Sequence, residues 1–293
     1  MEPAPTGIFT FTFDTLPAGR VREVAAEVDE LGYGAIWLPE VFGRDPFVAA
    51  SLLLGATDRL SVGTGIASIY FREAPAMAAA ARSLAEAHPG RFVLGLGVSH
   101  GPMVEGYLQR EYGPPIETMR AYLDRLDGSV YSAAAPSEEP LRVLAALGPR
   151  MLALAAERAG GALTYNVPLE HTSAARRALG PERLLAVEQK AVLETDAATA
   201  RQVGRAALGV YLGLPNYANN LLRHGFTADD LADGGSDRLI DALVAWGDVD
   251  AVRERVQAQR DAGADHVCVQ VLTTDPRRAP LEEWRRLAPA LLG

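Results

Sequence analysis

The sequence of 293 residues has little of three features that mark particular classes of protein. It has one cysteine, Cys268, so no disulfide can form within the chain, and the apolar run around it is typical of a buried strand. The net charge is −9 and no basic cluster offsets it, which argues against nucleic acid or an anionic membrane as a partner. No apolar run reaches the about 20 residues of a membrane span, and no signal peptide is evident, so we expect a cytoplasmic protein.

Motifs for metals and phosphate-binding loops are also missing. The five histidines are scattered, without the spacing to cysteine or carboxylates that metal sites use, so we expect no metal. Neither a P-loop nor a GxSxG pattern occurs. The glycine-rich stretch 95–101 does not match GxGxxG, and no helix follows it directly, so it is not interpreted as a dinucleotide-binding loop.

Short β-type runs and helical stretches alternate almost from end to end. Strands are predicted at 7–13, 34–38, 60–66, 91–97, 141–145, 161–164, 184–193 and 266–272. Helices are predicted at 17–31, 46–56, 74–87, 116–126, 169–179 and 197–212, and beginning at 149 and at 280. The alternation, without any change in composition, predicts one α/β domain over residues 1–293 with the (β/α)8 TIM barrel fold. An open doubly wound sheet is the alternative.

Residues 214–246 do not fit the alternation. This segment predicts short amphipathic helices inserted between the seventh and eighth strands. In a barrel it would rise from the carboxyl-end face, where active sites form, so we expect a lid or a subunit contact.

A predicted strand turns directly into a helix at Gly148-Pro149. Proline is tolerated as the first helical residue, and Gly148 lets a ligand approach the backbone closely. The free N–H groups at Arg150, Met151 and Leu152, together with the Arg150 charge, favour an anion at the helix start. The turn therefore predicts a seat for a cofactor phosphate, and an ordinary strand-to-helix connection is the alternative.

Three polar residues just past strand ends are candidates for chemistry. His100 follows a glycine-rich strand and can exchange a proton near neutral pH, although a surface histidine would look the same. Glu40 is a candidate base or hydrogen-bond acceptor, although a structural cap is the more common role at such a position. Asn166 suits the polar edge of a cofactor ring or, as often, caps the next turn.

Five segments occur together: YGAIWLPE (33–40), VGTGIASIYFREAP (62–75), RFVLGLGVSH (91–100), ALGPRMLALAAE (146–157) and GADHVCVQV (263–271). In this combination the chain resembles the luciferase-like monooxygenase superfamily, in the branch that uses the deazaflavin coenzyme F420. The resemblance implies a (β/α)8 barrel with a flavin or deazaflavin across its carboxyl-end mouth. It also implies a homodimer.

Carried over by position, the resemblance places a non-prolyl cis peptide at Gly65-Ile66, backing the cofactor ring. The predicted cofactor-binding residues are Gly65, Ile66, Ser68, Ala146, Gly148, Arg150, Met151 and Asn166. His100 and Glu40 are the predicted catalytic residues. His100 falls near the position where a glucose-6-phosphate dehydrogenase of the family carries a catalytic glutamate, and Glu40 falls where that enzyme carries a catalytic histidine. Because both residues differ, glucose 6-phosphate is not the expected substrate.

The activity implied is hydride transfer between coenzyme F420 and a small organic substrate, which the sequence does not identify. His100 and Glu40 are the candidates for the proton transfer that accompanies it. The alternatives are a monooxygenase using reduced FMN on the same fold, and a flavin-binding relative without catalytic activity.

Overall fold

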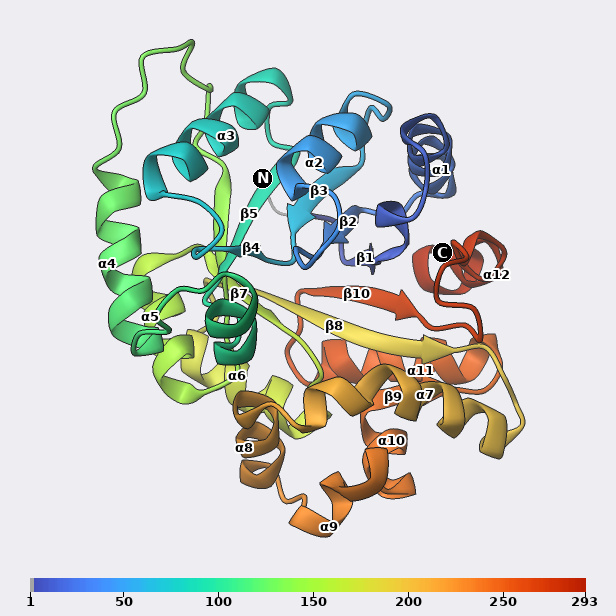
Figure 1. Ribbon diagram of the computed structural model, residues 1–293. Helices are drawn as coiled ribbons and strands as arrows, with labels where there is room; N and C mark the ends of the chain where they lie inside the picture. The colour runs from blue at the N-terminus through green and yellow to red at the C-terminus, as the bar shows by residue number, and fades with distance from the viewer. Residues whose placement is uncertain (1–2) are drawn as a thin grey trace.

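The computed structural model describes residues 3–293, so residues 1–2 of the predicted domain lie outside the described residues (Figure 1). Its centre is a barrel of parallel strands: β1 (Thr6–Phe9), β2 (Ala35–Leu38), β3 (Ser61–Thr64), β5 (Phe92–Gly97), β6 (Leu141–Ala145), β7 (Gly161–Thr164), β8 (Leu184–Val192) and β10 (His266–Val271). Strand β10 pairs with both β8 and β1, which closes the sheet. The predicted (β/α)8 TIM barrel is confirmed, and the open sheet is excluded.

Helices surround the barrel (Figure 1). They are α1 (Ala18–Leu31), α2 (Pro46–Leu54), α3 (Ala74–Ala87), α4 (Pro115–Asp127), α5 (Pro149–Arg158), α6 (Leu169–Leu179), α7 (Ala197–Leu212), α11 (Val249–Asp261) and α12 (Leu281–Leu292). A π-helical turn, η2 (Pro102–Tyr107), follows β5. Over residues 3–293, no helix combines the length and the apolar composition that crossing a membrane requires.

Three parts of the secondary structure differ from the sequence prediction. The first strand ends at Phe9 rather than at residue 13, because the chain turns into a short 3-10 helix, η1 (Thr12–Asp14). The hydroxyls of Thr10 and Thr12 lie 2.8 Å apart at this turn. The prediction omits α11, although the Asp248 side chain caps this helix by accepting from the Ala251 N–H at 2.9 Å. A two-residue strand, β4 (Ala67–Ser68), pairs with β5.

The segment between α7 and α11 contains α8 (Pro215–Arg223), α9 (Ala228–Leu231), η3 (Ala232–Gly234), α10 (Asp237–Leu243) and β9 (Val244–Trp246). The predicted short helices are present as α8, α9 and α10, whereas the last three residues of the segment form β9, which pairs with the carboxyl end of β8. The buried side chains of Leu208, Leu221, Phe226, Ile240 and Val244 form the core of this segment together with α7. In Figure 1, α8 to α10 lie together on one side of the barrel, next to α7.

Inside the barrel, one layer of side chains is apolar and tightly packed. It contains Phe9, Ala35, Trp37, Val93, Val143, Leu163, Leu184, Ala186 and the predicted buried cysteine, Cys268. Trp37 donates from Nε1 to His266 Nε2 at 2.9 Å, and His266 Nδ1 lies 2.5 Å from the Ala4 carbonyl oxygen. These contacts require a neutral ring with its proton on Nδ1. Burial lowers the pKa of His266 to about 4.

We expect acid to destabilise the protein partly through His266. Between its unfolded pKa of about 6.5 and its folded pKa of about 4, only the unfolded state takes up this proton, so the free energy of unfolding decreases as the pH is lowered through that window. His266→Leu removes this dependence, but it leaves Trp37 Nε1 unpaired and costs about 1–3 kcal/mol at pH 7. Urea unfolding at pH 7 and pH 5 measures both effects. An equal loss of unfolding free energy between pH 7 and pH 5 in the variant and in the parent protein would contradict a contribution from His266.

Candidate functional site

A cavity of about 1120 Å³ opens at the carboxyl ends of the barrel strands. Its walls come from the segments that follow β1, β2, β3, β5, β6 and β7, together with α7 and α8. This is the face on which TIM-barrel enzymes build their active sites. All of the predicted site residues except Ser68 and Asn166 line this cavity.

The two exceptions are buried behind the cavity wall. The Ser68 hydroxyl lies 3.3 Å from the Tyr70 N–H. Asn166 has a left-handed backbone (φ 56°), and its N–H donates to Glu188 Oε2 at 3.2 Å. The Asn166 side-chain amide has no hydrogen-bond partner within residues 3–293. Neither side chain therefore reaches the cavity in this conformation.

The backbone after β3 forms one wall of the cavity. The peptide bond between Gly65 and Ile66 is cis, as the resemblance implies. Ile66 packs against Gly97 so closely that a Cβ on Gly97 would lie 2.5 Å from Ile66 Cδ1. The absence of a side chain at Gly97 therefore decides where Ile66 sits on the wall.

Glu40 lines the cavity, but its carboxylate is already engaged. Glu40 Oε2 accepts from the Ser68 N–H at 2.7 Å and from Arg72 Nη1 at 3.0 Å. Glu40 Oε1 accepts from Arg72 Nη2, which also contacts Asp45 Oδ2 at 2.9 Å. These contacts tie the end of β2 to the backbone that follows the cis peptide. The geometry favours Glu40 as a group that holds this wall.

The predicted anion seat lies at the start of α5. Gly148 is extended (φ −87°, ψ 157°) and gives the helix no side-chain cap. The prediction of three free N–H groups is wrong for Met151 and Leu152, because both donate to the Gly148 carbonyl oxygen at 3.1 Å. Within residues 3–293, the Arg150 N–H has no backbone acceptor. Arg150 is exposed and contacts Glu117 Oε1 at 3.1 Å. Arg223, at the end of α8, lies so near that a Cβ on Gly148 would be 3.7 Å from its Nη2. Within residues 3–293, no carboxylate forms an ion pair with Arg223, so its charge is available to a ligand.

His100 is held at the end of β5 by residues of α8. It follows Ser99, whose φ is 56°, and its ring centroid lies 5.7 Å from that of Tyr217. Burial lowers the pKa of His100, and a hydrogen bond with the Asn216 side chain opposes this shift. The imidazole is therefore mainly neutral at pH 7 and is able to accept a proton.

A cluster of aromatic rings lines a further part of the cavity and connects to His100. Phe9 lies 5.7 Å from Phe11 and 5.0 Å from Tyr165 between ring centroids. Tyr165 lies 5.3 Å from Tyr211, and Tyr211 lies 5.2 Å from Tyr217, both edge to face. We call these five residues the aromatic wall. Of its three tyrosines, Tyr165 follows a predicted strand end, whereas Tyr211 and Tyr217 carry no local signal.

An ion pair is buried beneath the aromatic wall. Lys190 Nζ lies 3.1 Å from Glu188 Oε1, and both side chains are 1% exposed. Lys190 Nζ also lies 3.9 Å from the Tyr165 ring centroid and donates to Gln270 Oε1 at 3.3 Å. The Tyr165 hydroxyl donates to the same Gln270 oxygen at 2.9 Å. Burial raises the pKa of Glu188 and lowers that of Lys190, and each charge partly offsets the shift of the other.

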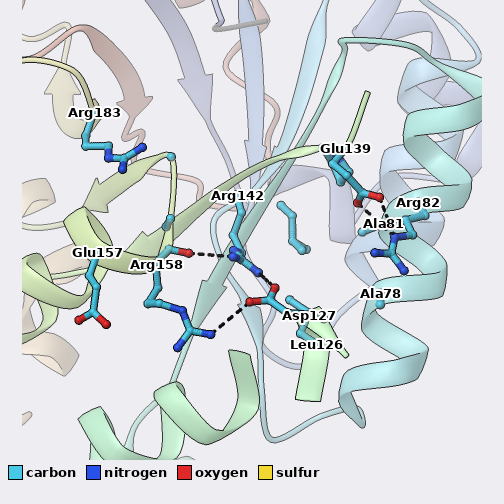
Figure 2. Close-up of a pocket in the computed structure, with 14 residues that line it drawn as sticks. Ala78, Ala81, Arg82, Leu126, Asp127, Glu139, Arg142, Glu157, Arg158 and Arg183 are labelled. Atoms are coloured by element: carbon cyan, nitrogen blue, oxygen red, sulfur yellow. Dashed lines mark hydrogen bonds and ion pairs between the residues drawn. The ribbon is translucent and has the colours of Figure 1, made fainter. Parts of the chain in front are cut away.

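A smaller pocket of about 540 Å³ lies outside the barrel, near the start of β6 (Figure 2). Figure 2 shows Arg142 and Arg158 both paired with Asp127, at 2.7 and 3.1 Å. Arg82 is paired with Glu139 at 3.0 Å. Each of these three arginines already has a carboxylate partner. Within residues 3–293, no group of histidine, cysteine and carboxylate side chains is placed to hold a metal ion.

Comparisons with known proteins identify the family to which this fold belongs. The chain is 27% identical to the putative coenzyme F420-dependent oxidoreductase Rv3520c of Mycobacterium tuberculosis, over 86% of this chain and 91% of the relative. It is 23% identical to 5,10-methylenetetrahydromethanopterin reductase of Methanolobus tindarius, over 88% of this chain and 93% of that protein. Its fold matches a solved F420-dependent secondary alcohol dehydrogenase with a TM-score of 0.78 and 13% identity, over all of both chains. The sequence model of the luciferase-like monooxygenase family matches residues 5–266, and the protein belongs to that family.

Proposed function

We propose that this protein is an oxidoreductase that transfers a hydride between coenzyme F420 and a small organic substrate. One observation carries the proposal: a single cavity joins Ile66, the cationic start of α5 and His100. Similarity to a protein named as F420-dependent, over most of both chains, favours the deazaflavin over FMN.

The residues of the cavity fit a deazaflavin with a phosphorylated side chain. Ile66 offers an apolar surface to a flat ring. Arg150, Arg223 and the free N–H at the start of α5 offer hydrogen bonds and positive charge to a phosphate. The bound cofactor would supply a carbon-centred hydride carrier that reacts poorly with oxygen.

The chain itself supplies orientation, exclusion of water and a proton carrier. The aromatic wall gives the cavity that contains Ile66 an apolar lining, which disfavours water beside a bound ring. His100 lies at the edge of that space, and its neutral ring takes a proton from a substrate hydroxyl during oxidation. In the reverse direction the protonated ring returns it.

The proposal is tested by loading the protein with F420 under anaerobic conditions and following the 420 nm absorbance with a panel of alcohols and ketones. A substrate-dependent absorbance change supports hydride transfer. Turnover with reduced FMN and oxygen, and none with F420, would instead establish the monooxygenase alternative. Tight cofactor binding without turnover of any substrate would favour the non-catalytic relative.

We expect Arg223→Gln to weaken F420 binding about tenfold or more, because a charge-assisted contact to phosphate contributes about 1.5–3 kcal/mol. Its affinity for the phosphate-free deazaflavin core should not change. Fluorescence titration with both compounds measures the difference. Arg177→Gln, on the exposed face of α6 and outside the cavity, is the matched control. Equal losses for both compounds would contradict a phosphate seat at this position.

We expect kcat/KM for substrate oxidation to fall at low pH, with a midpoint below the ordinary histidine pKa of about 6.5, because the protonated His100 ring no longer accepts a proton. His100→Gln removes this limb of the profile. Asn216→Leu removes a hydrogen bond that raises the His100 pKa, so the midpoint moves to lower pH. Measurements of kcat/KM between pH 4.5 and 8 test both expectations. An unchanged midpoint in Asn216→Leu would contradict the hydrogen bond between His100 and Asn216.

Glu40→Gln separates the two roles considered for this carboxylate. If Glu40 holds the wall, the amide loses the ion pair with Arg72, cofactor affinity falls, and the unfolding free energy drops by about 1–3 kcal/mol. The pH profile of kcat/KM should keep its shape. Unchanged cofactor affinity combined with a lost pH limb would show that Glu40 carries the proton instead.

A further inference from the structure

We propose that the substrate is an uncharged, ring-containing compound that lies on the aromatic wall at Tyr165, Tyr211 and Tyr217. The inference rests on the proposed function, because that function assigns the Ile66 and Gly148 parts of the cavity to the cofactor. What remains for the substrate is the space bounded by the aromatic wall, Val210, Leu214 and His100.

The aromatic wall offers ring faces and edges to a ligand. Its tyrosines meet edge to face, with centroids 5.2 to 6.3 Å apart, so they present surfaces at steep angles to one another. Flat or alicyclic rings contact such a surface over a large area, with the edge and face contacts that aromatic groups prefer. His100 packs on Tyr217, so a ring bound here lies beside the proton carrier.

The four charged side chains that line the cavity already have a partner or a proposed ligand. They are Glu40, Glu117, Arg150 and Arg223. Glu40 is held by Arg72, Glu117 is held by Arg150, and Arg223 lies at the phosphate seat. An anionic substrate on the aromatic wall would therefore lose its water without gaining a partner, which is strongly unfavourable.

The buried ion pair also disfavours cations, which aromatic rings otherwise attract. Lys190 Nζ lies 3.9 Å from the centroid of Tyr165 and 5.8 Å from that of Tyr211. The face of the Tyr165 ring that meets Lys190 is thus already occupied by a cation of the protein and is not open to a second one. Glu188 lies 3.1 Å from Lys190 Nζ and balances its charge, so the pair presents no net charge to an anion or to a cation. The aromatic wall is thereby suited to neutral rings.

Calorimetric titration with three probes of one ring size tests this inference: benzyl alcohol, benzoate and benzyltrimethylammonium. We expect benzyl alcohol to bind the F420-loaded protein at least about tenfold more tightly than either ion. Equal or tighter binding of benzoate or of benzyltrimethylammonium would overturn the inference. This comparison uses the unaltered protein, so it does not depend on the folding of any variant.

Variants then locate the binding surface. Tyr211→Ala and Tyr217→Ala should each weaken benzyl alcohol binding at least about fivefold. Tyr131→Ala, a tyrosine outside the cavity that packs on Arg82, should not change it. Weaker benzyl alcohol binding in Tyr131→Ala, or unchanged binding in both Tyr211→Ala and Tyr217→Ala, would show that benzyl alcohol binds outside the aromatic wall.

The same titrations on cofactor-free protein separate this inference from the proposed function. Failure to bind F420, with the preference for benzyl alcohol intact, would overturn the proposed function and support the neutral-ring site. Turnover of F420 combined with tighter binding of benzoate or benzyltrimethylammonium would support the proposed function and overturn the inference of an uncharged substrate.

Discussion

Closure of the parallel sheet is the constraint on which the whole site depends. Because β10 pairs with β1 on one side and with β8 on the other, every strand points its carboxyl end at the same opening. Residues far apart in the sequence, such as Ile66, His100 and Tyr165, therefore line one cavity. None of them has a neighbour in the sequence that would bring the others near, so the chemistry exists only once the barrel has closed.

Helix α8 connects the two ends of the cavity. Asn216 and Tyr217, near its start, contact His100, whereas Arg223, its last residue, lies at the anion seat. A helix of nine residues is about 13 Å long, comparable to a cofactor ring and part of its side chain. The segment expected to act as a lid thus adds residues to both the proposed phosphate site and the surroundings of His100, the proposed proton carrier, and its position affects both at once.

The sequence is informative wherever the signal is local. Strand runs such as GAIWL and the Gly148-Pro149 turn follow from backbone chemistry, and the resemblance placed the cis peptide at Gly65-Ile66. The tyrosines on α7 and α8 and the cation at Arg223 gave no such signal, because the fold of the segment after β8 decides where these residues point. Glu188 and Lys190 could not be predicted either, because only the closed barrel brings both side chains to its interior, where they form an ion pair beneath Tyr165.

The central claim is that one cavity holds a deazaflavin with its ring against Ile66 and its phosphate at the start of α5. A crystal structure of the protein with F420 bound tests this most directly. The account predicts a ring contact with the Gly65-Ile66 peptide and a phosphate oxygen within hydrogen-bond distance of Arg150 or Arg223. A phosphate bound elsewhere, or a ring turned away from Ile66 with its reactive carbon distant from His100, would contradict it.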